Sequence, residues 1–189
     1  MLSETDFDTV GGTTPGPAIQ LGNVTPGDEG SLTVRVSVPE GEESGRPVEL
    51  FVGADVLETA ENGLTEPEEE AGDTTPEAGE LQDAIEAVAW YDVGAAGVDG
   101  AGACNGGREP GEPLLAEGTL ADVLTDLAGP TPIDPSSNPE PPCFAPGDSI
   151  CLSMTWTLPK DVGNVVQTDS VAFDLRFIAE QCGKSGGAP

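Results

Sequence analysis

The chain contains no histidine, and its basic and aromatic residues are scarce. Six Lys and Arg residues stand against 35 Asp and Glu residues, so 189 residues carry a formal net charge of −29, and aromatic residues make up 4%. Without histidine, Ser–His and Cys–His catalytic pairs and the H-E-x-x-H zinc motif are excluded. The charge disfavours binding to nucleic acid and to anionic membranes. No phosphate-binding G-x-x-x-x-G-K-[ST] motif occurs either. We therefore expect no enzyme, no catalytic residue, no cofactor and no nucleic-acid partner.

Acidic residues beside glycine-containing turns are the remaining candidates for a metal site. Asp92, Asp99 and Asp161 occupy such positions, and Ca²⁺ favours carboxylate oxygens in loops of this kind. However, no D-x-D-x-D-G motif accompanies them, and a chain this acidic has carboxylates in many of its turns. We therefore predict no metal ligand. The densest acidic run, at residues 66–70, is interpreted as a solvated surface loop.

Self-repulsion on this scale restricts the conditions under which the chain can fold. A folded domain with few basic residues is destabilised by its own charge at ordinary ionic strength. Intrinsic disorder is one outcome for such a chain, and folding in molar salt, where the Debye length falls to about 3 Å, is the other. Alternating apolar patterns and four cysteines favour a folded protein, which indicates an extremely halophilic source.

The cysteines predict two disulfides. Cys104, Cys143, Cys151 and Cys182 form no C-x-x-C pair and have no histidine to complete a zinc site. The turn at 146–148 brings Cys143 and Cys151 within reach of each other, and Cys104–Cys182 follows by elimination. The alternative, Cys104–Cys143 with Cys151–Cys182, is close behind.

Disulfides also predict the compartment, because they form outside the cytosol. We therefore expect an extracellular or cell-surface location. No apolar run approaches the roughly 20 residues of a membrane span, so we expect none in the mature chain. Asn23-Val24-Thr25 is a glycosylation sequon, which makes Asn23 a candidate N-glycosylation site.

Strict alternation of apolar and polar residues predicts half-buried antiparallel strands. It occurs at residues 31–38, 48–52, 150–158 and 171–177. A short helix is expected at 81–87 and another at 119–127, the latter capped by Thr119, while residues 58–79 and 129–142 read as loops. These features predict a single all-β antiparallel sandwich with short inserted helices and long acidic loops.

Five short motifs follow one another in a distinctive order along the chain. They are G-N-V-T-P-G-D at 22–28, G-T-L-A-D-V-L at 118–124, F-A-P-G-D at 144–148, V-G-N-V-V-Q-T-D-S with F-D-L within 162–175, and A-E-Q-C at 179–182. In this order they resemble the TasA/camelysin family and its haloarchaeal relatives with SipW-type signal peptides. Camelysin-like proteins have been classed as metallopeptidases, and the lack of histidine means that this activity is not carried over.

The resemblance implies a secreted jelly-roll subunit that polymerises into a biofilm matrix fibre or bundling pilus. In such fibres an N-terminal segment of one subunit completes a sheet of the next, giving a head-to-tail homopolymer in which the partner is the protein itself. Residues 1–21 would then be the donor segment and residues 22–189 the sandwich domain. The apolar residues of the donor segment are Leu2, Phe7, Val10, Ile19 and Leu21.

Ile19 and Leu21 are spaced at i, i+2, which suits them to one face of a partner sheet. The alternative for this segment is a disordered acidic tail. The alternative function is a monomeric secreted binding module at the cell surface, built on the same sandwich and specific for calcium or a polysaccharide.

The charge imbalance predicts a fold that depends on salt. Screening removes repulsion that six basic residues cannot offset, so the folded signal should weaken below roughly 0.5 M salt. Thermal melts followed by circular dichroism, from dilute buffer to molar KCl, would measure this. A melting temperature that does not change over that range would contradict the halophilic interpretation.

Overall fold

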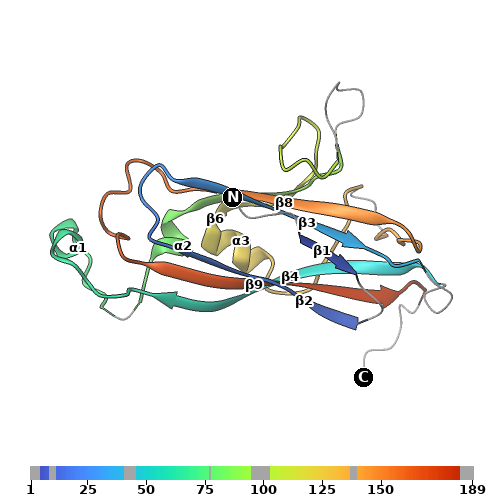
Figure 1. Ribbon diagram of the computed structural model, residues 1–189, viewed down its shortest axis with the longest axis horizontal. Helices are drawn as coiled ribbons and strands as arrows, with labels where there is room; N and C mark the ends of the chain where they lie inside the picture. The colour runs from blue at the N-terminus through green and yellow to red at the C-terminus, as the bar shows by residue number, and fades with distance from the viewer. Residues whose placement is uncertain are drawn as a thin grey trace.

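Two β-sheets pack face to face in the computed structural model, which describes residues 5–8, 12–40, 46–76, 78–94, 103–136 and 140–183 (Figure 1). The five-stranded sheet has the order β1-β3-β8-β5-β6 and the four-stranded sheet the order β2-β9-β4-β7. The strands are β1 (Thr5–Asp8), β2 (Gly12–Gly22), β3 (Glu29–Ser37), β4 (Val48–Ala60), β5 (Glu86–Tyr91), β6 (Leu114–Thr119), β7 (Thr131–Pro132), β8 (Ser149–Thr157) and β9 (Ser170–Gln181).

The strand pairing is that of a jelly roll. Antiparallel pairs form between β2 and β9, β3 and β8, β4 and β7, and β5 and β6, as in one long hairpin folded back on itself. Further antiparallel pairs, β4 with β9 and β5 with β8, divide this hairpin into two sheets. The predicted antiparallel jelly-roll sandwich is therefore confirmed. β1 lies outside this set, because it pairs with β3 in parallel.

Aliphatic side chains fill the space between the sheets. Val34 and Val36 of β3 are buried, as are Phe173 and Phe177 of β9, so the alternation predicted in these strands is confirmed. α3 (Leu120–Asp126) contributes Leu120, Val123 and Leu124 to the core. Thr119 caps this helix, as predicted: its hydroxyl accepts the Asp122 N–H at 3.1 Å.

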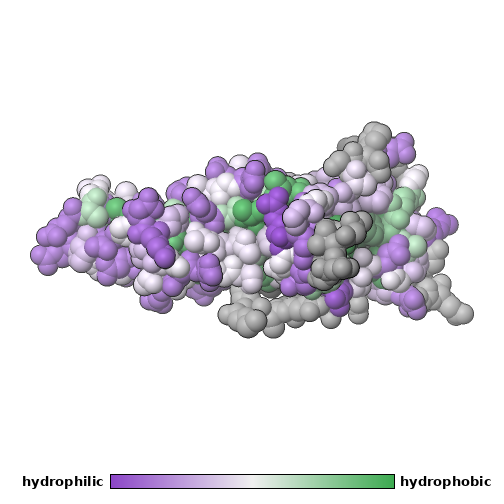
Figure 2. Space-filling view, turned by 90° about the horizontal axis from the view of Figure 1, so that it is seen from above, coloured by the Kyte–Doolittle hydropathy of each residue, from purple (hydrophilic) through white to green (hydrophobic). Residues whose placement is uncertain are grey.

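The expected acidic loop at 58–79 is in part regular structure. β4 continues to Ala60, and α1 (Glu66–Ala71) follows, with the Glu68 carboxylate accepting the Thr65 N–H at its first turn. α2 (Leu81–Ala84) is shorter than predicted, since β5 begins at Glu86. Figure 2 shows hydrophilic side chains gathered over the tapered end of the molecule that carries α1.

The disulfides are Cys104–Cys151 and Cys143–Cys182, with Cα–Cα distances of 5.3 and 6.1 Å, so both predicted pairings are wrong. The expected turn at 146–148 does form, with the Asp148 N–H donating to the Ala145 carbonyl, but it carries the chain from one sheet to the other. Phe144 bridges to Val48 in the four-stranded sheet, whereas Cys151 lies in β8 of the five-stranded sheet.

Neighbouring backbone contacts explain both bridges. The Cys182 N–H donates to the Pro47 carbonyl, so Cys182 and Cys143 lie beside the same end of β4. On the other sheet, the Asp92 N–H donates to the Cys151 carbonyl and the Cys104 N–H donates to the Asp92 carbonyl.

Two disulfides indicate a protein that folds outside the cytosol. Among the described residues, no helix is long and apolar enough to cross a bilayer.

Replacing cysteines in pairs tests this connectivity. Cys143→Ala with Cys182→Ala should leave no free thiol and lower the free energy of unfolding by about 2–4 kcal/mol, because a 39-residue loop is released. Cys143→Ala with Cys151→Ala should instead leave two unpaired thiols, measured by thiol titration in denaturant. A reversed result, with thiols free in the first variant and absent in the second, would support Cys143–Cys151 instead.

Candidate functional site

The N-terminal strands lie at the edges of both sheets. β1 pairs with the outer side of β3, and β2 forms the edge of the four-stranded sheet beside β9. In the β2–β9 register, Ile19 lies opposite Phe173 and Leu21 opposite Val171. Ile19 and Leu21 are both buried in the core of the sandwich.

The segment expected to enter a neighbouring subunit therefore completes the sheets of its own chain in this structure. The boundary predicted after residue 21 falls at the end of β2, not between a linker and a domain. Ile19 and Leu21 fill one face of a sheet, as their spacing indicates. Phe7 lies in β1, paired through its backbone with Val36, while Leu2 and Val10 lie outside the described residues.

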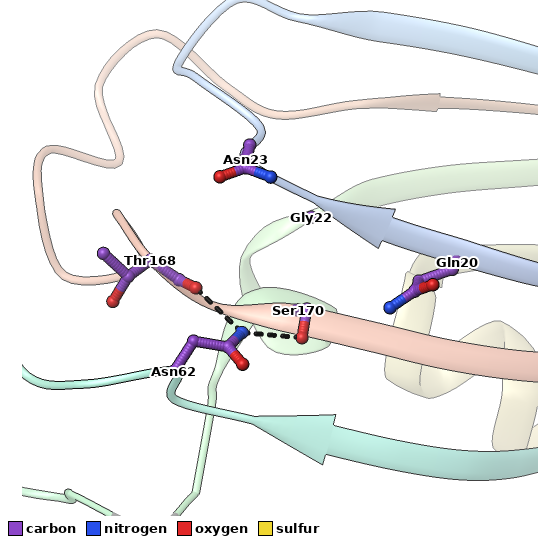
Figure 3. A pocket seen from close by; sticks show the side chains of 6 residues that line it. All are labelled: Gln20, Gly22, Asn23, Asn62, Thr168 and Ser170. Carbon is purple, nitrogen blue, oxygen red and sulfur yellow. Dashed lines mark hydrogen bonds between the residues drawn. The ribbon is translucent and has the colours of Figure 1, made fainter.

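A polar pocket of about 570 Å³ opens where β2 ends, β4 ends and β9 begins (Figure 3). The Asn62 amide donates to the Thr168 carbonyl at 3.0 Å and to the Ser170 hydroxyl at 2.8 Å. Gln20, Gly22 and Asn23 line the opposite side. Asn23, the candidate glycosylation site, is exposed at the start of the turn after β2.

Five carboxylates converge beside this pocket. Glu61 follows β4, Glu68 lies in α1, Asp73 follows α1, Glu80 precedes α2, and Asp169 precedes β9. Carboxylate oxygens of Glu61, Asp73 and Glu80 lie within 4.8 Å of one another, as do those of Glu61, Glu68 and Asp169. Glu61, Glu68 and Asp169 are at most 2% exposed, although each has an ionisable carboxyl group. We call these five residues the acidic cluster.

In most members of the acidic cluster, one carboxylate oxygen accepts a hydrogen bond from an N–H or hydroxyl group and the other oxygen does not. Asp169 accepts the Glu80 N–H at 2.6 Å and Asp73 accepts the Thr75 N–H, while the Thr75 hydroxyl lies between Asp73 and Glu80 and can donate to either. The second oxygens of Glu61, Asp73, Glu80 and Asp169 are buried and accept no hydrogen bond from an N–H or hydroxyl group of the described residues.

Glu68 differs from the other members, because both of its oxygens are engaged. One accepts the Thr65 N–H, and the other accepts the Thr168 N–H and hydroxyl. The backbone at residue 79 passes close to the end of β4, which requires glycine. A Cβ atom at Gly79 would lie 2.5 Å from the Ala60 carbonyl oxygen.

Burial and mutual repulsion divide these acids into two kinds. Burial, a hydrogen bond with Asp169 and the charges of its acidic neighbours raise the pKa of Glu61 to about 7. Burial also raises the pKa of Asp169. Burial acts in the same direction on Glu68, but hydrogen bonds from Thr65 and Thr168 outweigh it and lower its pKa. Hydrogen bonds from Thr75 lower the pKa of Asp73.

A second acidic group surrounds Asp92, one of the three residues considered above as calcium ligands. Asp92 is fully buried, but its carboxylate accepts the Gly106 N–H at 2.7 Å and the Ser153 hydroxyl at 2.7 Å. It therefore organises the loop that Cys104 anchors. Asp161 is exposed, and Asp99 lies outside the described residues.

The sequence analysis missed the acidic cluster because a dense acidic run was assigned to solvent. One signal was available: Thr65-Glu66-Pro67-Glu68 has the capping-box spacing, with proline near the helix start. That spacing predicts a helix whose Glu68 turns inward toward the backbone. Nothing in the sequence indicates that Glu61 and Asp169, which are far apart along the chain, meet there.

Comparison with known proteins leaves the family open, because neither a protein-family model nor a curated protein sequence matches the chain significantly. The likeness to the TasA/camelysin family rests on the five motifs described above.

The raised pKa of Glu61 predicts how the free energy of unfolding changes with pH when no metal ion is bound to these carboxylates. Between the ordinary value of 4.5 and about 7, the folded state holds a proton that the unfolded chain has released. Stability should therefore fall as pH rises through this window. Denaturant unfolding in chelator at pH 5 and pH 8 would measure the fall.

Glu61→Gln should lose this part of the pH dependence, whereas Glu69→Gln, on the exposed side of α1, should keep it. Equal pH dependence in wild type and Glu61→Gln would contradict the assignment.

Proposed function

We propose that the protein is a structural subunit of an extracellular filament of a halophilic archaeon, a biofilm matrix fibre or bundling pilus. Its N-terminal segment is exchanged between neighbouring subunits. The observation that carries the proposal is the position of this segment: residues before the first turn supply an edge strand to each of the two sheets. The motif resemblance to fibre-forming proteins supports the same conclusion.

A terminal edge strand is the element most easily exchanged. It can leave without unthreading any loop, and the β9 and β3 edges that it uncovers are templates for an identical strand from another copy. The register of Ile19 and Leu21 against β9 can then be reproduced between chains without loss of contacts. A segment that swings out of its own subunit can pair with a second copy while the edges that it leaves accept the segment of a third copy, so repeated exchange is head-to-tail and open-ended.

Another sheet edge is protected against strand addition. Beyond the short β7, the outer side of β4 carries Val56 and Leu57, which are 51% and 54% exposed. Asp55 and Glu58 flank this pair, and the β4–β9 register shifts between Val56 and Glu58. Charges and bulges of this kind discourage edge-to-edge association, which favours the edges beneath the N-terminal strands as the acceptor.

An engineered disulfide across the β2–β9 pair distinguishes exchange from self-completion. Gln20 and Ala172 are register partners, so Gln20→Cys with Ala172→Cys should form a bridge wherever these strands meet. In fibres assembled in molar salt, we expect a ladder of covalent multimers on non-reducing gels, because each bridge joins two subunits. Monomers alone from fibre samples would contradict strand exchange.

The matched control places a cysteine pair on strands that stay in one chain. Ser31 and Thr155 are register partners of β3 and β8, so Ser31→Cys with Thr155→Cys should form a bridge within one chain. Fibres of this variant should therefore run as monomers on non-reducing gels.

A chain lacking residues 1–18 should remain folded but form no fibres by electron microscopy. Wild-type protein that stays monodisperse in molar salt would favour the monomeric binding module instead.

A further inference from the structure

The acidic cluster contains buried oxygens that no N–H or hydroxyl group of the described residues satisfies. The free oxygens belong to Glu61, Asp73, Glu80 and Asp169. Glu61 and Asp169 are 2% and 1% exposed, and Asp73 is 9% exposed. Buried polar atoms are normally hydrogen-bonded, and an unpaired buried carboxylate is strongly destabilising. A proton shared by Glu61 and Asp169 can join two of these oxygens, which leaves the buried oxygens of Asp73 and Glu80 without a partner among the described residues.

Nearby basic side chains do not supply that partner. The donors to these carboxylates are threonine hydroxyls and backbone N–H groups. Within the described ranges, no lysine or arginine makes a hydrogen bond or ion pair with the acidic cluster; Arg176, for example, pairs with Asp55. The charge that neutralises these acids must therefore come from solution.

We propose that the acidic cluster is a Ca²⁺ site, with Glu61, Asp73 and Glu80 as ligands and with Asp169 positioning Glu61 and Glu80 from outside the ligand shell. Ca²⁺ takes about 6–8 oxygen ligands at about 2.3–2.6 Å, and two ligands of one ion therefore lie at most about 5 Å apart. The oxygens of Glu61, Asp73 and Glu80, which lie within 4.8 Å of one another, meet this condition. Glu61 also lies within 4.8 Å of Glu68 and Asp169, so it links the three ligands to the rest of the acidic cluster.

Ligand chemistry separates Ca²⁺ from other ions. The cluster offers oxygen atoms alone, and soft or borderline metals such as Zn²⁺ favour nitrogen and sulfur. Mg²⁺ is smaller, requires near-octahedral geometry and usually keeps several waters, so it is rarely bound by a cage of carboxylates. A hollow of about 320 Å³ lined by Asp73, Thr75 and Glu80 gives an ion access from solvent.

The hydrogen bonds already present hold the ligands in position before an ion binds. Glu80 N–H fixes Asp169, Thr75 fixes both Asp73 and Glu80, and Thr168 contacts both Glu61 and Glu68. Outer contacts of this kind orient metal ligands and increase affinity.

Bound Ca²⁺ would fasten the end of the sandwich that the disulfides do not reach. β9 begins next to Asp169 and ends next to Cys182, which bonds to Cys143. Cys151 lies near the start of β8, also away from the acidic cluster. The ion would join the end of β4 and the α1 loop directly and the start of β9 through Asp169, much as the disulfide joins the other end of β4 and β9.

Calcium titration of the full-length protein tests this site. Protein stripped with EDTA is returned to about 2 M KCl at pH 8, so that general charge screening is saturated, and CaCl₂ is added. We expect at least one tightly bound Ca²⁺ per chain by calorimetry. The melting temperature should rise by about 5–10 °C at a Ca²⁺ concentration about a hundredfold above Kd. MgCl₂ at the same concentrations should have a much smaller effect.

Isosteric variants separate a ligand from a merely structural acid. Glu61→Gln and Asp169→Asn should each weaken Ca²⁺ binding at least tenfold, while Glu69→Gln, exposed on the same short helix, should leave it unchanged. In EDTA, Glu61→Gln should melt at or above the wild-type temperature, because one repulsive buried charge is gone. In saturating Ca²⁺, the wild type should instead melt at a higher temperature than Glu61→Gln.

Three results would overturn the proposal. One is no thermal response to CaCl₂ beyond that of KCl, and another is an equal response to MgCl₂. The third is Ca²⁺ binding that Glu61→Gln and Asp169→Asn leave intact. The proposal does not depend on filament formation, since the residues of the acidic cluster belong to one chain and the results are read from Ca²⁺ binding and thermal melting alone.

Discussion

The pairing of β9 with both β2 and β4 is the interaction on which the rest of the structure depends. β9 is hydrogen-bonded along nearly its whole length on both sides, and its inward side chains Phe173 and Phe177 are fully buried. The strand begins beside Asp169 of the acidic cluster and ends beside Cys182. Both ends of the sandwich are therefore organised around one strand, and the exchangeable edge lies along its side.

The two ends of β9 are stabilised by different means. At one end a covalent bond between Cys143 and Cys182 joins segments that flank the start of β4. At the other end the structure collects carboxylates whose oxygens face one another. Thr168 connects this end to the polar pocket where β2 stops, because its hydroxyl contacts Glu61 and Glu68 and its carbonyl accepts from Asn62. Thr168 thus links the acidic cluster to the pocket at the end of β2.

The elements that the sequence predicted well are those with local signals. Alternation of apolar residues located β3, β8 and β9, since the apolar residues of each strand face the core with a period of two, although in β8 the intervening residues Cys151 and Ser153 are buried as well. Thr119 marked the start of α3 through its capping position. By contrast, β6 was missed because Leu114-Leu115-Ala116-Glu117-Gly118 is short and has no alternation. α1 was missed because its acidic residues resemble a solvated loop.

The sequence by itself determined the charge imbalance, the absence of histidine chemistry, the half-buried strands and hence the sandwich, because these properties follow from composition and from the period of the chain. Only the tertiary structure decided the disulfide partners, since Phe144 and Cys151 belong to different sheets although a short turn separates them. It also decided which carboxylates are buried. Glu61 and Asp169 meet because β4 and β9 are antiparallel neighbours, and proximity between strands so distant along the chain depends on register, which no local pattern encodes.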